Sequence, residues 1–350
     1  MADFLVDETE MQEYTFSEIK KSFEHHFRHC ESYRRFCEEG YHITPADLNS
    51  FADLEKIPQI PTAVFKSIDI CSVEKETCKC CKSSGTKGAV SKIYRNKQTV
   101  RAFLESVLRE AKRMYGLTAE NCVIYDLGPA EEEAGDVWLA YAMGFLRNAV
   151  ESFHFMQQGV LETGRLLEML QNHDSAKRIV LLGPPAFYVR VFEHMEETGM
   201  RLQLPESTLL LTAGGWKSKS GDTMSRESLN ALIVKYLGIG EAQIYDVYNQ
   251  VESNTPFFEC RCHNKHVPEG FHIIVRDPRT FEPLAEGREG VVTFLDPSSD
   301  SYPAFVTTDD IGFVTSACPC GRKGQVFHYV RRVKTVETKG CAMKLDQKMA

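Results

Sequence analysis

The stretch RIVLLGPPAFYVRVFEHMEETGMRLQLPESTLLLTAGGW, residues 178–216, decides the fold class. It contains two apolar runs, 178–182 and 208–212, and each is followed by small turn residues, Gly-Pro-Pro and Gly-Gly. Short apolar runs that end in such residues predict buried strands. The residues between them predict a helix near 186–198. The stretch therefore predicts a strand, a helix and a second strand in that order.

The same alternation continues on both sides of this stretch. Strands are predicted over 123–125 and 243–248, and helices over 99–115, 136–147 and 225–237. Strands that alternate with helices form a mostly parallel sheet covered on both faces. Ligands of such sheets bind at the carboxyl ends of the strands. We therefore expect the glycine-rich strand ends to line a site.

The two ends of the chain depart from this pattern. Residues 16–37 carry apolar and aromatic side chains at helical spacing, whereas 271–275 and 290–295 predict antiparallel strands. The predicted fold class is thus α/β, with mostly parallel sheets, flanking helices and a small β-rich subdomain.

Composition narrows the class of protein. The 350 residues carry a net charge of −8 without a long basic run, which argues against nucleic acid as a partner. The acidic start lacks the features of a signal peptide, and no run of roughly 18 apolar residues predicts a membrane span. Twelve cysteines in a chain expected to be cytoplasmic favour free thiols, metal ligands or a reactive thiol over disulfides.

The segment KSSGTKG, residues 82–88, is the sharpest local feature. Small residues allow the backbone to approach a polyphosphate, amides and hydroxyls can donate hydrogen bonds to it, and Lys87 adds a compact positive charge. The spacing differs from the P-loop pattern G-x-x-x-x-G-K-[ST], so a Walker-type NTPase is not supported. Taken alone, such a loop is more often a surface turn, and the phosphate hypothesis needs partners elsewhere in the chain.

A resemblance supplies these partners. The chain resembles the adenylate-forming superfamily of acyl-CoA synthetases and luciferases in five segments, which occur in the order that the family uses. The segments are Ser83–Gly88, Thr212–Trp216, Tyr248–Glu252, Thr307–Asp310 and Arg331. The chain departs from the family's motifs at Asn249, Val251 and Asp309, where the family has Gly, Thr and Gly.

The resemblance implies a role for each matched residue. A phosphate loop would comprise Ser83, Ser84, Gly85, Thr86, Lys87 and Gly88. The nucleotide base would lie against Gly214, Gly215, Trp216 and Tyr248, the ribose against Asp310, and a magnesium ion against Glu252. Arg331 would belong to the family's hinge. The implied chemistry joins a carboxylate to the α-phosphorus of ATP, and the field of Thr86, Lys87 and magnesium would neutralise the anions.

Two short clusters predict a metal site. Cys260–His266 (CRCHNKH) lies about fifty residues before Cys318-Pro319-Cys320, and paired thiols and imidazoles at short spacing are a zinc pattern. By similarity to the phenylacetate-CoA-ligase-like branch of the superfamily, the ligands would be Cys260, His266, Cys318 and Cys320. Cys262 and His263 remain alternative ligands. Four ligands would make a closed, structural Zn²⁺ site.

The C-terminal segment ETKGCA, residues 337–342, together with Trp216 after the glycine pair, resembles the LuxE-like acyl-protein synthetases. In that branch a cysteine near the C-terminus accepts the acyl group from the adenylate, and Cys341 is the matching residue. A thiolate is a suitable nucleophile for a mixed anhydride. The resemblance implies a fatty acid as substrate and an acyl-CoA-reductase-like subunit as acceptor. The catalytic set is then Thr86, Lys87, Glu252, Arg331 and Cys341.

The expected organisation is an adenylating domain over 1–325, with the α/β body to about 255 and the β-rich subdomain over about 256–325. A hinge remnant and tail follow over 326–350, without the full lid domain of the superfamily. Two other functions remain open: a ligase that acylates free CoA or a carrier thiol, and a catalytically reduced nucleotide-binding subunit. The identity of the acyl chain and the oligomeric state are left undecided by the sequence.

Overall fold

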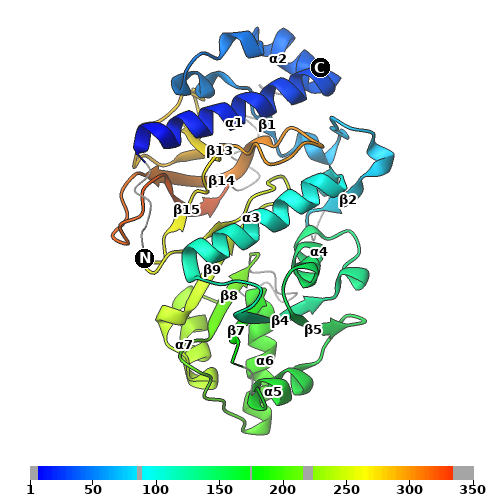
Figure 1. Cartoon of the computed structure of the whole chain (residues 1–350), viewed down its shortest axis with the longest axis vertical. Helices are drawn as coiled ribbons and strands as arrows, with labels where there is room; N and C mark the ends of the chain where they lie inside the picture. The colour runs from blue at the N-terminus through cyan, green and yellow to red at the C-terminus, as the bar shows by residue number, and fades with distance from the viewer. Residues whose placement is uncertain (1–6, 85–88, 174–175, 216–223, 334–350) are drawn as a thin grey trace. The chain divides into compact units, whose positions relative to one another are not determined.

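A computed structural model describes residues 7–84, 89–173, 176–215 and 224–333 (Figure 1). The chain divides into two compact units. Unit 1 comprises Met1–Ser106, Gln250–Phe257 and Asn264–Ala350, and unit 2 comprises Val107–Asn249 and Phe258–His263. The predicted domain limits at 255 and 325 remain a prediction.

Unit 2 is built on the predicted parallel sheet. The strand order is β10-β9-β8-β7-β4-β5-β6, in which β5, β4, β7, β8 and β9 pair in parallel and β6 pairs antiparallel with β5. The strands are β4 (Cys122–Pro129), β5 (Ser152–Gln157), β6 (Val160–Leu161), β7 (Arg178–Gly183), β8 (Leu209–Ala213), β9 (Ile244–Tyr248) and β10 (Phe257–Phe258). The predicted strands within this sheet are confirmed.

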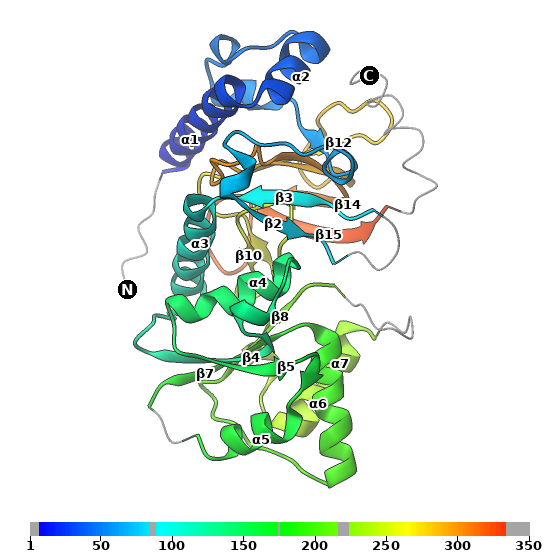
Figure 2. The same ribbon diagram turned by 90° about the vertical axis from the view of Figure 1, so that its right-hand side faces the viewer.

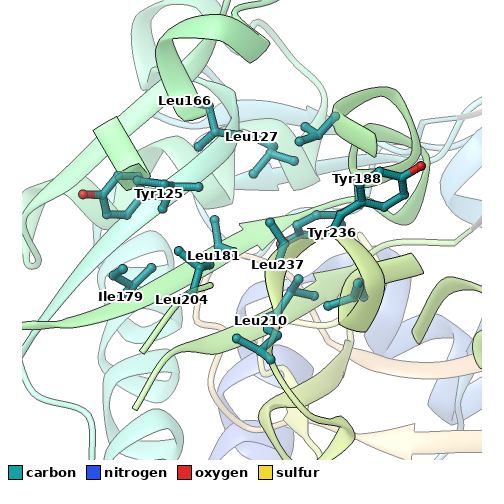
Figure 3. Packing of buried hydrophobic residues seen from close by; sticks show 14 of the residues in the cluster. Tyr125, Leu127, Leu166, Ile179, Leu181, Tyr188, Leu204, Leu210, Tyr236 and Leu237 are labelled. Carbon is teal, nitrogen blue, oxygen red and sulfur yellow. The ribbon is translucent and has the colours of Figure 1, made fainter. Parts of the chain in front are cut away.

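Apolar side chains from one face of this sheet pack against three helices to form the core of unit 2 (Figure 3). The helices are α5 (Thr163–Gln171), α6 (Pro185–Thr198) and α7 (Arg226–Leu237). Helix α6 has Pro185 in its first turn, and α7 begins at the N-cap Ser225, whose side chain accepts the Ser228 N–H. Helix α4 (Trp138–Phe145) follows β4 and contacts it.

Unit 1 contains an antiparallel sheet with the strand order β11-β15-β14-β13-β12, and β1 pairs in parallel with β14 (Figure 2). The strands are β1 (Ile60–Pro61), β11 (Lys265–His266), β12 (His272–Arg276), β13 (Gly290–Leu295), β14 (Phe305–Thr315) and β15 (Val326–Arg332). A separate hairpin pairs β2 (Lys79–Lys82) with β3 (Lys92–Arg95). The predicted antiparallel strands and the fold class are confirmed.

The N-terminal helical segment is two helices, α1 (Glu8–His29) and α2 (Glu31–Tyr41), where the sequence predicted one helical stretch. The break falls at Cys30, whose extended backbone (φ −113°, ψ 98°) ends α1 and begins α2. Helix α3 (Lys97–Tyr115) matches its prediction. Short 3-10 turns are Pro45–Asp47, Phe51–Lys56, Val64–Lys66, Lys75–Thr77, Glu131–Glu133, Leu146–Asn148 and Glu241–Gln243. Among the described residues, no helix is both long and apolar enough to cross a membrane.

Candidate active site

The hairpin of β2 and β3 holds the base of the predicted phosphate loop. Ser83 and Ser91 close the hairpin reciprocally, because the Ser83 amide donates to the Ser91 carbonyl at 3.1 Å and the Ser91 amide donates to the Ser83 hydroxyl at 3.1 Å. Ser84 is exposed. The remaining loop residues of the prediction, Gly85, Thr86, Lys87 and Gly88, lie outside the described residues. The described part thus defines the stem of the loop.

Glu252 is buried in unit 1, with 5% of its surface exposed. Burial raises the pKa of its carboxyl group, and the hydrogen bond from the Ser91 side chain and the nearby Arg332 oppose that rise. Ser91 belongs to the loop stem, so its side chain connects that stem to the predicted magnesium ligand. A buried carboxylate favours a cation partner, because a nearby positive charge offsets its lost hydration.

Asp310 occupies β14 and is 4% exposed. Its carboxylate accepts a hydrogen bond from Gln250 Nε2 at 2.5 Å and lies 3.6 Å from Arg332 Nε. Its amide donates to the Thr308 hydroxyl at 3.1 Å. Antiparallel pairing places Asp310 opposite Arg332 on β15, while the predicted hinge residue Arg331 lies opposite Ile311 and is exposed. The pairing therefore assigns the contact with Asp310 to Arg332.

Unit 1 thus brings together Glu252, Asp310 and the loop stem from three separate parts of the sequence. Arg332 connects the two carboxylates, since it pairs with Asp310 and lowers the pKa of Glu252. Asp309, which precedes Asp310 on β14, has the opposite effect and raises the pKa of Glu252. The cluster thus combines two buried carboxylates, Glu252 and Asp310, with the basic side chain of Arg332, a setting that suits an anionic ligand accompanied by a cation.

In unit 2 the predicted adenine-pocket residues lie at the carboxyl ends of β8 and β9. Gly214 has φ +81°, a backbone conformation that favours glycine, and a Cβ atom there would also displace the end of the Leu139 side chain. Gly215 is exposed, and Tyr248 is half-buried at the end of β9. The next residue, Asn249, accepts a hydrogen bond from Trp138 Nε1 at 2.9 Å. Trp216 lies outside the described residues.

A buried acid–imidazole pair that the sequence did not predict occupies the same edge of this sheet. Asp126 on β4 and His154 on β5 are neighbours in the parallel register, with Oδ2 and Nδ1 3.1 Å apart. Asp126 also accepts the Gly128 amide at 2.6 Å, and burial raises the pKa of its carboxyl group. The pairing of β4 with β5 brings these two residues together, and no local sequence motif predicts that contact.

Three of the four predicted zinc ligands gather in unit 1. The ligand atoms of His266, Cys318 and Cys320 lie within 4.8 Å of one another, and His266 Nε2 is 3.3 Å from Cys320 Sγ. Zinc–nitrogen and zinc–sulfur bonds of about 2.0–2.3 Å place tetrahedral ligand atoms roughly 3.5–3.8 Å apart, so the spacing suits zinc. Asn264 Nδ2 donates to Cys318 Sγ at 3.3 Å, which would support a thiolate there.

The fourth predicted ligand, Cys260, is buried and belongs to unit 2. Its sulfur accepts the Cys262 amide at 3.4 Å. The preceding residue, Glu259, is anchored by Arg226 of α7 through two hydrogen bonds of 2.6 and 2.7 Å and by the Asp246 amide at 2.8 Å. The Cys260 backbone is therefore held on its N-terminal side.

The last predicted residue, Cys341, lies outside the described residues, and its role remains a prediction. The sequence missed Ser91, Gln250 and Arg332. Gln250 lies inside the motif that marked Glu252, and Arg332 adjoins Arg331. The contact of Arg332 with Asp310 depends on the register between β14 and β15, which the sequence alone does not give. The hinge role of Arg331 stays a prediction.

Solved structures show which class of enzyme has this fold. Crystal structures of 2-hydroxyisobutyryl-CoA ligase, one in an open conformation and one in the thioesterification state, match with TM-scores of 0.70 and 0.72 at 16% identity. They cover 93% and 94% of this chain and 74% and 70% of those chains, and both contain the acyl-adenylate 2-HIB-AMP and CoA. A long-chain-fatty-acid-CoA ligase of Archaeoglobus fulgidus matches with a TM-score of 0.51 at 14% identity, over 76% of this chain and 53% of that chain. The fold is that of the adenylate-forming ligases.

Sequence comparison identifies the particular family. The family model described as "Acyl-protein synthetase, LuxE" matches residues 3–350, and the chain belongs to this family. Long-chain-fatty-acid–luciferin-component ligases of Aliivibrio fischeri and Vibrio harveyi are 30% and 31% identical to it. The alignments cover 98% and 97% of this chain and 93% and 89% of those relatives. The predicted resemblance is confirmed, and with it the prediction of an acyl-adenylating ligase.

Proposed function

We propose that this enzyme activates a long-chain fatty acid with ATP and transfers the acyl group through Cys341 to an acceptor protein. The observation that carries the choice of substrate is the match with two long-chain-fatty-acid ligases over nearly the whole chain. The unit 1 cluster of Glu252, Asp310 and the loop stem supports nucleotide activation, because it combines buried carboxylates with a phosphate-loop stem.

The first step joins the fatty acid to AMP. A carboxylate oxygen of the acid attacks the α-phosphorus of ATP, the bond from that phosphorus to the bridging oxygen of the β-phosphate breaks, and pyrophosphate leaves. The chain's contribution is to align two anions and to stabilise the developing charge. In this proposal Lys87 and the loop amides bind the phosphates, and Asp310 accepts hydrogen bonds from the ribose hydroxyls.

Glu252 would hold the magnesium ion of MgATP, which neutralises phosphate charge when it is bound. The fit rests on chemistry present in the chain: magnesium prefers oxygen ligands, and Glu252 is a buried carboxylate whose ionised form gains from a cation. Arg332 and Gln250 keep the neighbouring carboxylate of Asp310 in place.

The second step moves the acyl group to sulfur. The Cys341 thiolate attacks the acyl carbon, the bond from that carbon to the AMP oxygen breaks, AMP leaves, and the thiol proton has passed to solvent. The thioester then reacts with a nucleophile on an acceptor protein, for which an acyl-CoA-reductase-like subunit is the proposed partner. A thioester is the appropriate product because it retains enough reactivity for the next transfer.

The metal cluster supports a structural role for zinc. We propose that Cys260, His266, Cys318 and Cys320 bind one Zn²⁺ ion, with Asn264 supporting the Cys318 thiolate. A soft donor set of three sulfurs and one imidazole favours zinc over magnesium. Four protein ligands would leave no open position for chemistry. Zinc content after purification without chelators tests this assignment, and less than about half an equivalent would contradict it.

Acyl labelling tests the proposed transfer. Incubation with ATP and labelled hexadecanoic acid should label the protein, and neutral hydroxylamine should release the label because it cleaves thioesters. The variant Cys341→Ser should lose this label but keep fatty-acid-dependent ATP–pyrophosphate exchange. The control Cys71→Ser, which changes a partly buried thiol outside the proposed sites, should keep both. Full labelling of Cys341→Ser would contradict the carrier role. Rapid turnover of that variant with free CoA would favour the alternative of an acyl-CoA ligase.

A further inference from the structure

Arg95 is a buried arginine whose contacts surround the segment that carries Glu252. It ends β3 and is 1% exposed. Its Nη2 atom donates to the carbonyl of Val251 at 2.6 Å and to that of Ser253 at 3.0 Å. Its Nε atom donates to Asn254 Oδ1 at 3.0 Å. One guanidinium group thus holds the backbone on both sides of Glu252.

Tyr302 completes this arrangement. Its hydroxyl donates to the carbonyl of Glu252 itself at 3.2 Å. It also lies 3.1 Å from Arg95 Nη2, whose two N–H groups are shared between this oxygen and the two carbonyls. The guanidinium carbon lies 5.3 Å from the centre of the Tyr302 ring, and Tyr302 is fully buried. The carbonyls of three consecutive residues, 251, 252 and 253, are therefore held by two side chains. Three successive carbonyls held in this way fix the main chain at Glu252, and with it the direction in which its side chain leaves the backbone.

The same strand also fixes the loop stem. Ser91 lies four residues before Arg95, immediately ahead of β3, and its side chain bonds to the Glu252 carboxylate while its amide bonds to Ser83. The short segment from Ser91 to Arg95 therefore contacts the phosphate-loop stem, the Glu252 carboxylate and the Glu252 backbone. These contacts link the stem of the loop, at Ser83, to the Glu252 carboxylate.

We propose that Arg95 and Tyr302 are positioning residues that hold the Glu252 carboxylate in register with the phosphate loop, so that one nucleotide can present its phosphates and its magnesium ion together. The inference rests on the proposed function, in which Glu252 binds that ion. Arg95 acts through the backbone of residues 251–253. Placement matters because a misplacement of about 1 Å in a reacting assembly can reduce the rate by 100-fold.

The contacts made by residue 95 require an arginine side chain. Its planar group presents several donors in a fixed fork, whereas a lysine ammonium is a flexible point charge that cannot match the same set of acceptors. Burying a guanidinium group costs free energy unless its donors are satisfied. Arg95→Lys therefore keeps the charge but removes the geometry, and Tyr302→Phe removes only the hydroxyl.

Unit 1 contains a matched control. Arg276 is also buried, and it makes the same kinds of contact: Nε donates to Gln59 Oε1 at 3.1 Å, Nη2 to the Glu55 carbonyl at 2.7 Å and Nη1 to the Phe281 carbonyl at 3.2 Å. None of these partners belongs to the proposed site. Arg276→Lys thus reports the general effect of this substitution on unit 1.

The experiment measures fatty-acid-dependent ATP–pyrophosphate exchange as a function of free Mg²⁺ at saturating ATP. Loss of one hydrogen bond of about 0.5–1.5 kcal/mol corresponds to a change of roughly 2–10-fold. We expect the half-saturating Mg²⁺ concentration to rise about tenfold in Arg95→Lys and about threefold in Tyr302→Phe. It should stay within about twofold of the wild-type value in Arg276→Lys.

Equal shifts of the half-saturating Mg²⁺ concentration in Arg95→Lys and Arg276→Lys would overturn the proposal, because the effect would then reflect general destabilisation of unit 1. If Arg95→Lys does not fold, an unchanged Mg²⁺ midpoint in folded Tyr302→Phe would overturn it. If the wild-type enzyme shows no exchange with any fatty acid, the proposed function fails first. The positioning role is then measured by calorimetric titration of ATP at several Mg²⁺ concentrations, and identical Mg²⁺ dependence in all variants would contradict it.

Discussion

Acidification should destabilise unit 1 through the buried imidazole of His26. This side chain lies in α1 and is fully buried, with Nδ1 2.7 Å from the Ser72 hydroxyl and Nε2 3.0 Å from the Ser299 carbonyl. Burial, together with the nearby imidazoles of His25 and His29, lowers the pKa of His26 from 6.5 to about 3. The folded state therefore keeps His26 neutral at pH values where the unfolded chain protonates it.

The sign and size follow from linkage. The unfolded state binds the proton first as the pH falls below about 6.5, so the free energy of unfolding decreases progressively toward about pH 3. At about pH 5 the unfolded imidazole has titrated over roughly 1.5 pH units at about 1.36 kcal/mol each, which corresponds to a loss of about 2 kcal/mol. Such a loss is a large share of the free energy that stabilises a typical domain.

Native-state hydrogen exchange of the α1 amides at about pH 7 and pH 5 measures this effect. The two tryptophans, Trp138 and Trp216, both fall within unit 2, so tryptophan fluorescence would follow the wrong unit. Between the two pH values, the wild-type protein should lose about 2 kcal/mol more than His26→Gln, whatever that variant's stability at neutral pH. The exposed neighbour provides the control His29→Gln, whose pH-dependent loss should stay close to that of the wild-type protein because burial is the main cause of the lowered pKa of His26. An equal pH dependence in His26→Gln and wild type would refute the reasoning.

Three further changes give defined outcomes. Asp310→Ala should raise the KM for ATP by roughly 10–100-fold with a smaller change in kcat, since hydrogen bonds to a charged group contribute about 1.5–3 kcal/mol; an unchanged KM would remove Asp310 from the nucleotide site. Glu259→Gln should destabilise unit 2 by roughly 2–4 kcal/mol, because it leaves Arg226 without its carboxylate partner; the 39% exposure of Arg226 keeps the loss below that of a fully buried pair. Urea unfolding followed by tryptophan fluorescence measures this loss, and a value below about 0.5 kcal/mol would contradict the prediction. Cys320→Ala should reduce bound zinc below about half an equivalent, while Cys122→Ala, which changes a buried thiol outside the cluster, should keep it.

The parallel sheet of unit 2 could be predicted because its strands are apolar runs that end in glycine and proline. Buried parallel strands have this appearance in any sequence. The break at Cys30 could not be predicted, because no glycine or proline marks it. The hairpin of β5 and β6 was also missed, although its turn residues Gln158 and Gly159 adopt positive φ angles of 48° and 77°. A single glycine next to glutamine is a weak signal for such a turn.

The candidate site was predictable where function requires a particular residue type at a particular spacing. Glu252 and Asp310 are candidates because of motifs, and the structure shows that both are buried; their roles stay predictions. Ser91 and Arg95 were missed for a different reason: a serine just before a short strand and an arginine at its end resemble ordinary surface residues. Their importance depends on contacts with residues some 160 positions away, between Arg95 and Asn254 for example. Pairings of that kind arise from tertiary structure and are not encoded in any local pattern.

Fatty-acid-dependent exchange of labelled pyrophosphate into ATP tests the central claim most directly, because it detects formation of the acyl-adenylate without requiring an acceptor. The account predicts exchange that needs both Mg²⁺ and a long-chain fatty acid, and that falls at least 100-fold in Glu252→Gln while the folded fraction is unchanged. Absence of exchange with every fatty acid tested, or full exchange in Glu252→Gln, would contradict it.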